Sequence, residues 1–255
     1  MKCTFLGHST LLLQSGADAV LTDPLLTPRI MLKKRATAPG LALQDLPRLT
    51  AITISHAHTD HLHLPSLALL PRDCLLIVPS GVGRFVRRLG FSEVRELAWG
   101  ESTTAGTFTI TAIPVNHVRG RFFPWQDTGV NSYVLADAAH AFFAAGDIDF
   151  GPSPEMAQLA DRFVLSAAAL PVGGMREVAY YERRRGKKGV HIDPRTAWEL
   201  FLQTGARMMV PIHWGVVRMA GTPVREPVEA VLEAARAHQM ADRVRVLDPG
   251  EAWEL

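Results

Sequence analysis

The sequence predicts an α/β sandwich in which two β-sheets pack face to face and helices cover their outer faces. Short β-type runs separated by turn residues are followed by helical segments, and this pattern occurs twice along the chain. Strands followed by helices, repeated once, are typical of two layered sheets with helices outside. The chain has 255 residues, of which 47% are hydrophobic and 20% charged, so we expect one domain over residues 1–255.

The first half of the chain is predicted to be mainly strands. CTFLG, TLLLQS and AVLTD are β-type runs, and residues 15–18 form a predicted hairpin connection. Residues 28–47 carry basic and turn residues, which predicts an excursion from the sheet. A buried strand is expected over 51–55, a helix over about 65–70, a strand at CLLIVP, and a helix over 81–89 that Gly90 closes.

The second half alternates strands with longer helices. FTITAIPVNH, NSYVLA and AFFAAG are predicted strands, and a helix is expected over 154–163. LSAAALP and ARMMVPI are further strands, and between them Asp193 and Pro194 begin a helix that runs to Gly205. An amphipathic helix over 224–238 and a final strand at VRVLDPG complete the predicted order.

Charge and cysteine content exclude several classes of protein. A net charge of +2 predicts no strong general attraction to nucleic acid. Cys3 and Cys74 have no CxxC spacing, so we expect two small buried residues rather than a disulfide framework. The N-terminal residues MKCTFLGHST lack a long apolar run and an A-x-A-type cleavage site, so we expect no secretory signal. No apolar run reaches the roughly 20 residues that span a bilayer. We therefore expect a cytoplasmic protein.

The segment HAHTDH, directly after the predicted strand 51–55, is the strongest chemical signal in the chain. His56 and His58 are two residues apart, so an extended backbone directs both imidazoles to the same side. Asp60 and His61 follow where the chain turns toward the next helix. Imidazole nitrogen and carboxylate oxygen together are ligands for divalent metals such as zinc. Surface histidines on a polar loop are the alternative, but the density and position of this motif favour a metal site.

HAHTDH resembles the HxHxDH signature of the metallo-β-lactamase superfamily, whose fold is a sandwich of two mixed sheets. Three later residues match the remaining ligands of that family in the expected order: His117 in AIPVNH, Asp147 in FFAAGD and His213 in PIHWG. The resemblance implies one metal held by His56, His58 and His117. It implies a second metal held by Asp60, His61 and His213, with Asp147 bridging both.

The flanking motifs narrow the resemblance. FLGHSTLLLQ, LTDPLLTPR, ISHAHTDHL, HIDP and VPIHWG are similar to the branch that contains N-acyl-phosphatidylethanolamine-hydrolysing phospholipase D, with the ascorbate-6-phosphate lactonases nearby. This implies a binuclear hydrolase in which a metal-bridging hydroxide attacks a phosphodiester. A lactonase or other carboxylic-ester hydrolase is the alternative, and a nuclease or a non-catalytic metal-binding protein is less favoured. Zinc is the default metal for such a site, while manganese, iron and nickel stay open.

The resemblance also assigns roles to single residues. Either Asp60 or Asp147 is expected to orient the nucleophile, and His191 in HIDP is expected to border the substrate phosphate. Asp23 in TDP matches a carboxylate that orients a ligating imidazole, although capping of the turn before Pro24 explains it equally well. For His8 in GHST we expect a structural role, because it lies far from HAHTDH in sequence. The loop after Asp147 departs from the family pattern, reading GDID where the family often has GDT or GDTG.

Two basic clusters bear on the partners of the protein. RRRGKK at 183–188 is one, and Arg29, Lys33, Lys34 and Arg35 around Ile30, Met31 and Leu32 form the other. A solvated surface is the usual explanation of such runs. The more specific explanations are a membrane contact or the attraction of an anionic substrate. We therefore expect a small-molecule or lipid anionic substrate, and a peripheral membrane contact and a homo-oligomer stay open.

Overall fold

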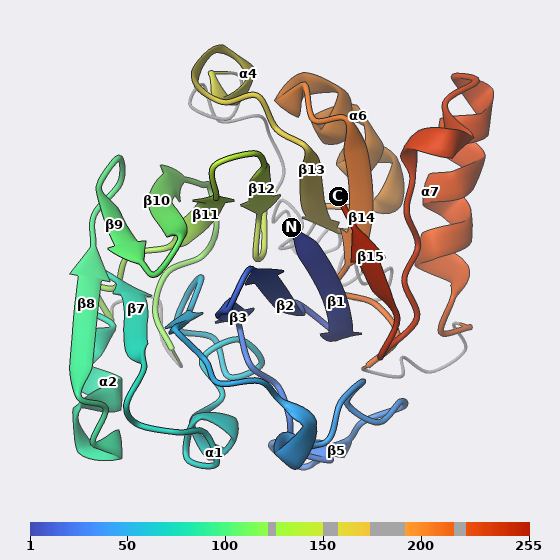
Figure 1. Cartoon of the computed structure of the whole chain (residues 1–255). Coiled ribbons are helices and arrows are strands. Elements are labelled where there is room, and N and C mark those ends of the chain that lie inside the picture. Colours follow the sequence, from blue (N-terminus) through green and yellow to red (C-terminus); the bar gives the residue numbers. More distant parts are fainter. Residues whose placement is uncertain (122–125, 150–157, 174–191, 217–222) are drawn as a thin grey trace.

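The structure is a computed structural model that describes residues 1–121, 126–149, 158–173, 192–216 and 223–255. Within these residues two large β-sheets lie face to face, and the helices lie on the outer sides of this pair (Figure 1). Each large sheet contains both parallel and antiparallel strand pairs. The predicted sandwich of two mixed sheets is therefore confirmed.

The first sheet contains the N-terminal strands and the last strand of the chain. Its order is β15-β1-β2-β3-β6-β7-β8. The strands are β1 (Lys2–Gly7), β2 (Thr10–Ser15), β3 (Asp18–Thr22), β6 (Ala51–Thr53), β7 (Leu75–Pro79), β8 (Glu93–Leu97) and β15 (Ala252–Glu254). A separate two-stranded hairpin, β4 (Arg29–Ile30) and β5 (Lys33–Lys34), lies in the predicted excursion.

The second sheet is built from the middle of the chain, in the order β14-β13-β12-β11-β10-β9. The strands are β9 (Ser102–Ala105), β10 (Phe108–Pro114), β11 (Asn131–Ala136), β12 (Ala141–Ala144), β13 (Ala167–Pro171) and β14 (Met208–Ile212). The α-helices of the described residues are α1 (Leu64–Leu67), α2 (Gly83–Val86), α4 (Leu159–Arg162), α6 (Pro194–Thr204) and α7 (Glu226–Ala237). Three short 3-10 helices lie at Leu43–Asp45, Arg87–Leu89 and Ala241–Arg243.

Alternation along the strands divides the apolar residues between two cores. In β2, Leu11 and Leu13 face the second sheet and join the larger core, whereas Leu12 faces outward into a smaller core with residues of α1 and α2. Three consecutive leucines are buried because this strand is covered on both faces. The larger core continues through the second sheet to α6, where Trp198 is fully buried.

Most predicted elements are present, with shifted boundaries. Asp193 caps α6 by accepting a hydrogen bond from the Thr196 amide at 2.8 Å, and Gly205 ends the helix with a φ of +66°. The helix expected over 65–70 is the shorter α1, which begins one residue earlier. Of the helix expected over 154–163, residues 154–157 lie outside the described part, and α4 covers only Leu159–Arg162. Among the described helices, none combines the length and the hydropathy needed to cross a membrane.

The prediction of a final strand at VRVLDPG is wrong. Val244 makes only an isolated bridge to Met209, and the chain then runs without regular structure to Pro249 and Gly250. The last strand is β15, which pairs antiparallel with β1. The β-branched residues of VRVLDPG had suggested a strand, but that segment pairs with β14 only at one residue.

A partly buried side-chain contact links the two sheets at the end where β2 turns into β3. The Ser15 hydroxyl donates to Asp137 Oδ2 at 2.7 Å, and the amides of Ala139 and His140 donate to Asp137 Oδ1. Burial alone would raise the pKa of Asp137, but these hydrogen bonds outweigh it and lower the pKa from 3.8 to about 2. The carboxylate therefore stabilises the fold above about pH 4, and this contribution is lost as the pH falls through about 2.

We predict that Asp137→Ala lowers the free energy of unfolding at neutral pH by roughly 2 kcal/mol, because the shifted pKa represents about that much stabilisation. Urea unfolding at neutral pH and near pH 2 measures this, and the difference from the wild type should shrink at the lower pH. Asp161→Ala, at an exposed position in α4, is the matched control. An equal loss of stability at both pH values would contradict the electrostatic explanation.

Candidate metal centre

Strands of the first sheet bring three groups of polar residues to one edge. His8 follows β1, Asp23 follows β3, and the loop 56–61 follows β6. Because β2 runs antiparallel between β1 and β3, and β6 runs parallel to β3, the carboxyl ends of β1, β3 and β6 lie at the same edge. Residues that are up to about 50 positions apart in sequence therefore meet.

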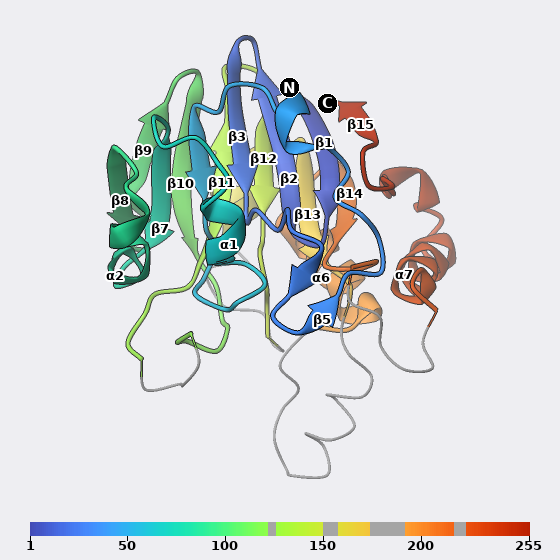
Figure 2. The ribbon, with the colours of Figure 1, turned by 90° about the horizontal axis from the view of Figure 1, so that it is seen from below.

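The second sheet contributes the remaining predicted ligands in the same way. His117 follows β10, Asp147 follows β12 and His213 follows β14. Strand β11 runs antiparallel between β10 and β12, and β12, β13 and β14 are mutually parallel, so these three carboxyl ends also share one edge. The loops from both sheets meet there, at the end of the molecule where Figure 2 shows α1 and β5.

Three histidines and an aspartate form the first cluster. His56 Nε2 lies 2.9 Å from His58 Nδ1, and His117 Nε2 lies 3.1 Å from the same His58 atom. Asp147 Oδ2 lies 3.8 Å from His56 Nε2 and 3.9 Å from His117 Nε2. The four residues thus offer one ligand atom each within 4.8 Å of one another, which suits a single metal ion.

The second cluster contains Asp60, His61, His213 and His8, again with one ligand atom each within 4.8 Å. Asp60 Oδ2 lies 3.7 Å from His213 Nε2 and 4.0 Å from His61 Nε2. The same oxygen lies 3.1 Å from His8 Nε2. The cluster contains the three residues that the resemblance assigns to a second metal, together with His8.

Asp147 lies between the two clusters. Its Oδ1 is 3.2 Å from His213 Nε2, and its Oδ2 is 3.1 Å from His61 Nε2. The same Oδ2 faces His56 and His117 of the first cluster. With 1% of its side chain exposed, this carboxylate contacts imidazoles of both clusters, which is the position expected of a bridging ligand.

The donor set fits divalent cations. An imidazole nitrogen carries either one proton or one lone pair, so His58 Nδ1 cannot satisfy both His56 Nε2 and His117 Nε2 with in-plane hydrogen bonds. A cation that accepts one lone pair from each ring satisfies all three. Nitrogen and carboxylate ligands in this mixture suit zinc, iron, nickel or manganese.

Two histidines of the first cluster, His56 and His58, are held neutral. Burial, with the neighbouring His117 acting in the same direction, lowers the pKa of His58 to about 4. Burial also lowers the pKa of His56 well below its usual value, with His61 and His117 acting in the same direction. Because metals bind the neutral imidazole, these rings present lone pairs at neutral pH.

The second cluster has a different charge distribution. Burial would lower the pKa of His61, but the carboxylates of Asp147 and Asp23 outweigh it and raise that pKa well above the usual value. Burial would raise the pKa of Asp60, but hydrogen bonds from His213 and His8 lower it well below the usual range. Asp60 is therefore ionised, and a metal must displace a proton from His61.

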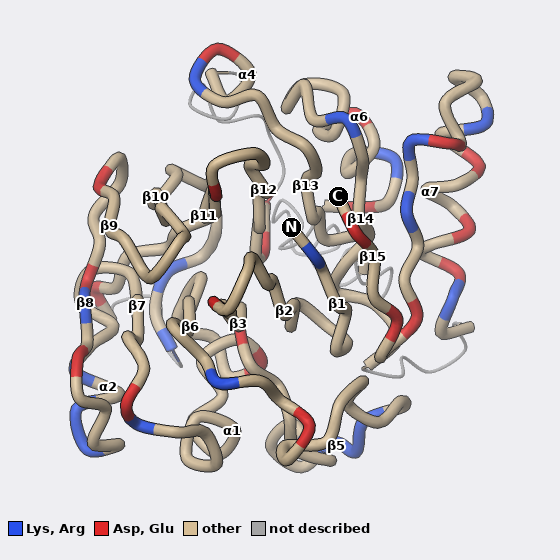
Figure 3. Tube along the Cα trace, in the orientation of Figure 1, with Lys and Arg blue, Asp and Glu red and all other residues tan. Residues whose placement is uncertain are grey.

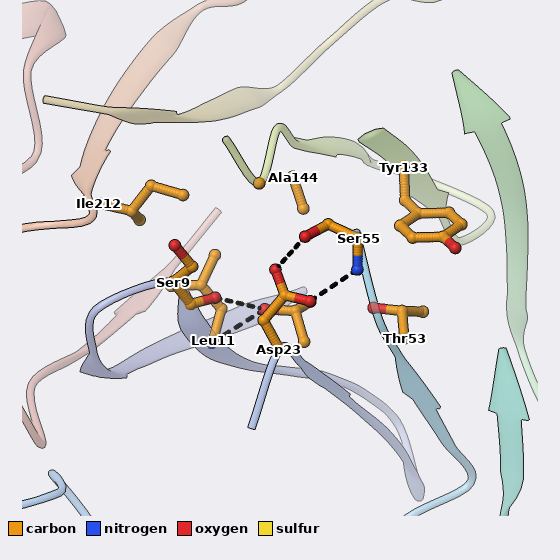
Figure 4. A pocket seen from close by; sticks show the side chains of 10 residues that line it. Ser9, Leu11, Asp23, Thr53, Ser55, Tyr133, Ala144 and Ile212 are labelled. Carbon is orange, nitrogen blue, oxygen red and sulfur yellow. Dashed lines mark hydrogen bonds between the residues drawn. The ribbon is translucent and has the colours of Figure 1, made fainter. Parts of the chain in front are cut away.

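Asp23 orients His61 from behind. Its Oδ2 lies 2.8 Å from His61 Nδ1. Asp23 Oδ1 accepts a hydrogen bond from the Ser55 amide at 2.7 Å, and Oδ2 accepts one from the Ser55 hydroxyl at 2.6 Å (Figure 4). The structure therefore favours the orienting role of Asp23 over turn capping. Gly146 packs against this pair with a φ of +66°, and a Cβ there would lie 2.6 Å from Ser55 Cβ. The glycine before Asp147 is thus a steric requirement.

Sequence reasoning missed Asp149 and gave His8 another role. Asp149 Oδ1 lies 3.0 Å from His117 Nδ1, on the ring nitrogen that faces away from the cluster. His8 was expected to be structural, but its ring contacts Asp60, and its backbone oxygen accepts a 2.8 Å hydrogen bond from the His213 amide. The aspartate at the altered GDID position was the available signal for Asp149.

Arg121 fixes the backbone of the loop that carries HAHTDH. Its Nη1 donates to the carbonyl oxygens of Ala57 at 3.0 Å and Leu62 at 2.9 Å. Since these carbonyls lie near the two ends of the loop, one guanidinium restrains the whole segment. No motif in the sequence pointed to this residue.

The predictions for His191 and for the basic segment 183–188 concern residues outside the described part of the chain. The other seven predicted site residues are brought together at the shared edge: His56, His58, Asp60, His61, His117, Asp147 and His213.

Comparison with known proteins agrees with this geometry. Residues 18–214 match the sequence family described as a beta-lactamase superfamily domain. An uncharacterized protein of Mycobacterium tuberculosis is 32% identical to this chain over 98% of the chain and 68% of its own length. The N-acyl-phosphatidylethanolamine-hydrolyzing phospholipase D 1 of Caenorhabditis elegans is 28% identical over 98% of the chain and 75% of its own length.

Solved structures show the same fold. A metallo hydrolase of the archaeon Ignicoccus hospitalis superposes with a TM-score of 0.73 at 21% identity, covering 100% of this chain and 98% of its own. A metallo-beta-lactamase fold protein of Bacillus subtilis gives a TM-score of 0.70 at 16% identity, with coverage of 100% and 98%. The matched family, the shared fold and the two ligand clusters lead to one conclusion: the chain belongs to the metallo-β-lactamase superfamily, as one of its metal-dependent hydrolases.

Proposed function

We propose that this protein holds two divalent ions, zinc by default, and hydrolyses a phosphodiester in the manner of a phospholipase D. The observation that carries the two-metal proposal is the position of Asp147, whose Oδ1 faces His213 and whose Oδ2 faces His56, His61 and His117. A carboxylate so placed suits two ions that share it. The similarity to the phospholipase D of C. elegans, which extends over nearly the whole chain, supports the phosphodiester as substrate.

Two divalent ions in this site would lower the pKa of a water molecule toward neutrality and stabilise negative charge that develops on oxygen. The residues of the chain perform the remaining tasks. Asp60 is the more accessible carboxylate, with 29% of its side chain exposed against 1% for Asp147. We assign to Asp60 the orientation of the attacking water, with His8 and His213 holding its Oδ2 in place.

Each ligand cluster has a carboxylate that orients one of its imidazoles. Asp23 contacts Nδ1 of His61, and Asp149 contacts Nδ1 of His117, so in both rings Nε2 faces the cluster. A carboxylate on the outer nitrogen fixes the tautomer and raises the basicity of the ligating nitrogen. We therefore assign Asp149 as a positioning residue for the first metal, and Asp23 for the second.

We predict that Asp147→Ala abolishes activity and removes bound metal, because the residue contacts both clusters. Turnover of bis-p-nitrophenyl phosphate, compared with a panel of lactones, measures activity. Elemental analysis after expression in zinc- or manganese-supplemented medium measures the metal. Asp161→Ala is the control for an exposed carboxylate.

Each result has a defined meaning. An Asp147→Ala variant with full metal content and full activity would disprove the assignment of Asp147. Turnover of lactones without turnover of phosphodiesters would assign the site to carboxylic-ester chemistry instead. A wild-type protein without bound metal would favour a non-catalytic role.

We predict that Asp149→Ala weakens metal binding by about 10- to 100-fold, the usual effect of removing a partner from a ligating imidazole. The effect should be confined to one of the two metals, because Asp149 contacts only His117 among the ligands. Chelator competition measures both affinities. Asp149→Asn, which keeps an acceptor for the imidazole N–H, should recover part of the loss. Two unchanged affinities in Asp149→Ala would refute the positioning role.

A further inference from the structure

The hairpin β4–β5 exposes two large apolar side chains at its tip. Met31 and Leu32 form the two-residue connection between the strands, and they are 67% and 91% exposed. Among the large apolar residues of the described chain, Leu32 is the most exposed, and Met31 is less exposed only than Leu32 and Val164, at 81%. An isolated exposed apolar residue is ordinary, but two adjacent ones at the tip of a projecting turn call for an explanation.

The fold itself does not require these residue types. Met31 has a φ of +50°, a conformation that glycine or asparagine adopts at lower cost than methionine. The exposed side chain of Leu32 is likewise less favourable in water than a polar side chain would be. Polar residues would therefore suit both the turn conformation and the contact with water better. The apolar side chains at this tip thus indicate a partner that buries them.

The body of the hairpin is held firmly against the molecule. Ile30 packs with Leu25 and Val216 in a small separate core. The buried Arg35 that follows β5 donates from its guanidinium to the carbonyl oxygens of Leu25 and, at 3.0 Å, Thr37. The exposed tip is thus carried on an anchored base rather than on a loose loop.

Three cations surround the apolar tip. Arg29, Lys33 and Lys34 are all exposed, and Figure 3 shows basic residues at β5. Arg29 also donates from Nη1 to the Leu32 carbonyl at 3.3 Å, which keeps its charge close to the tip. Apolar side chains next to exposed cations are the combination that binds an anionic lipid surface.

The hairpin lies at the same end of the molecule as the metal centre (Figure 2). Val216 beneath it is three residues after His213, and its carbonyl accepts a 2.7 Å hydrogen bond from the Ala36 amide. A surface that contacts the hairpin is therefore presented near the rim of the site.

We propose that the β4–β5 hairpin docks this protein on an anionic membrane, with Met31 and Leu32 entering the interfacial layer and Arg29, Lys33 and Lys34 meeting lipid phosphates. A protein partner fits less well, because two side chains cannot supply the roughly 800 Å² per partner of a standard protein interface. A bilayer, in contrast, can be engaged by one apolar tip supported by cations. This inference goes beyond the proposed function, and binding to a membrane requires no turnover.

Flotation of the full chain with vesicles tests the proposal. We expect binding to vesicles of equimolar phosphatidylcholine and phosphatidylserine, weakening as salt is added, and little binding to pure phosphatidylcholine. Lys33→Gln with Lys34→Gln should weaken binding by about 25-fold, from roughly fivefold for each charge. Met31→Asn with Leu32→Ser should weaken it by about tenfold, and asparagine tolerates the positive φ of the turn.

Matched controls lie at the opposite end of the strands, before β13 and β14. Val164→Ser removes an equally exposed apolar side chain and Arg207→Gln an exposed cation, and neither should change binding. Unchanged melting temperatures and metal contents show that each variant is folded. No binding of the wild type to anionic vesicles, or wild-type binding by both hairpin variants, would overturn the proposal.

A second measurement reports insertion directly. Cys3 and Cys74 are buried, so a polarity-sensitive fluorophore can be attached selectively to Leu32→Cys. Its emission should shift to the blue on anionic vesicles, whereas the same fluorophore on Val164→Cys should not respond. A response from both positions, or from neither, would contradict docking through the hairpin.

Discussion

A buried carboxylate between imidazoles is the interaction on which the site depends. Asp147 is almost fully enclosed, and an enclosed negative charge is costly unless cations or donors surround it. His61 and His213 lie within 3.2 Å of its two oxygens. The positive charge that His61 carries in the metal-free protein offsets this cost, and divalent ions would do so more strongly. The electrostatics of the site therefore favour the binding of divalent cations.

The strand directions explain how distant parts of the chain form this site. Every predicted ligand follows the carboxyl end of a strand, and the two sheets place those ends together. Backbone geometry at these points is unusual: His8, Asp23 and His213 are non-glycine residues with positive φ. Such conformations persist where surrounding contacts enforce them, and here the Asp23–Ser55 pair and the His8–His213 hydrogen bond do so.

Much of this could be predicted from the sequence, and the failures have physical causes. HAHTDH could be recognised because its ligands are close together in sequence. The start of α6 could be recognised at Asp193 and Pro194 because helix capping also depends on residues that are close in sequence. Asp149 could not be assigned, since its partner His117 is 32 residues away and only the sheet pairing brings them together. The segment VRVLDPG has strand-forming residues but almost no pairing partner, and whether a strand pairs is a property of the whole fold.

Both ligand clusters take residues from each sheet. His56 and His58 come from the first sheet and His117 from the second, and likewise His61 comes from the first and His213 from the second. An ion bound at either cluster would therefore act as a cross-link between the two layers of the sandwich. Because the unfolded chain cannot assemble these ligands, the binding free energy adds to the stability of the folded state and grows with the free metal concentration. The resistance of this protein to heat would then report the metal supply of its surroundings.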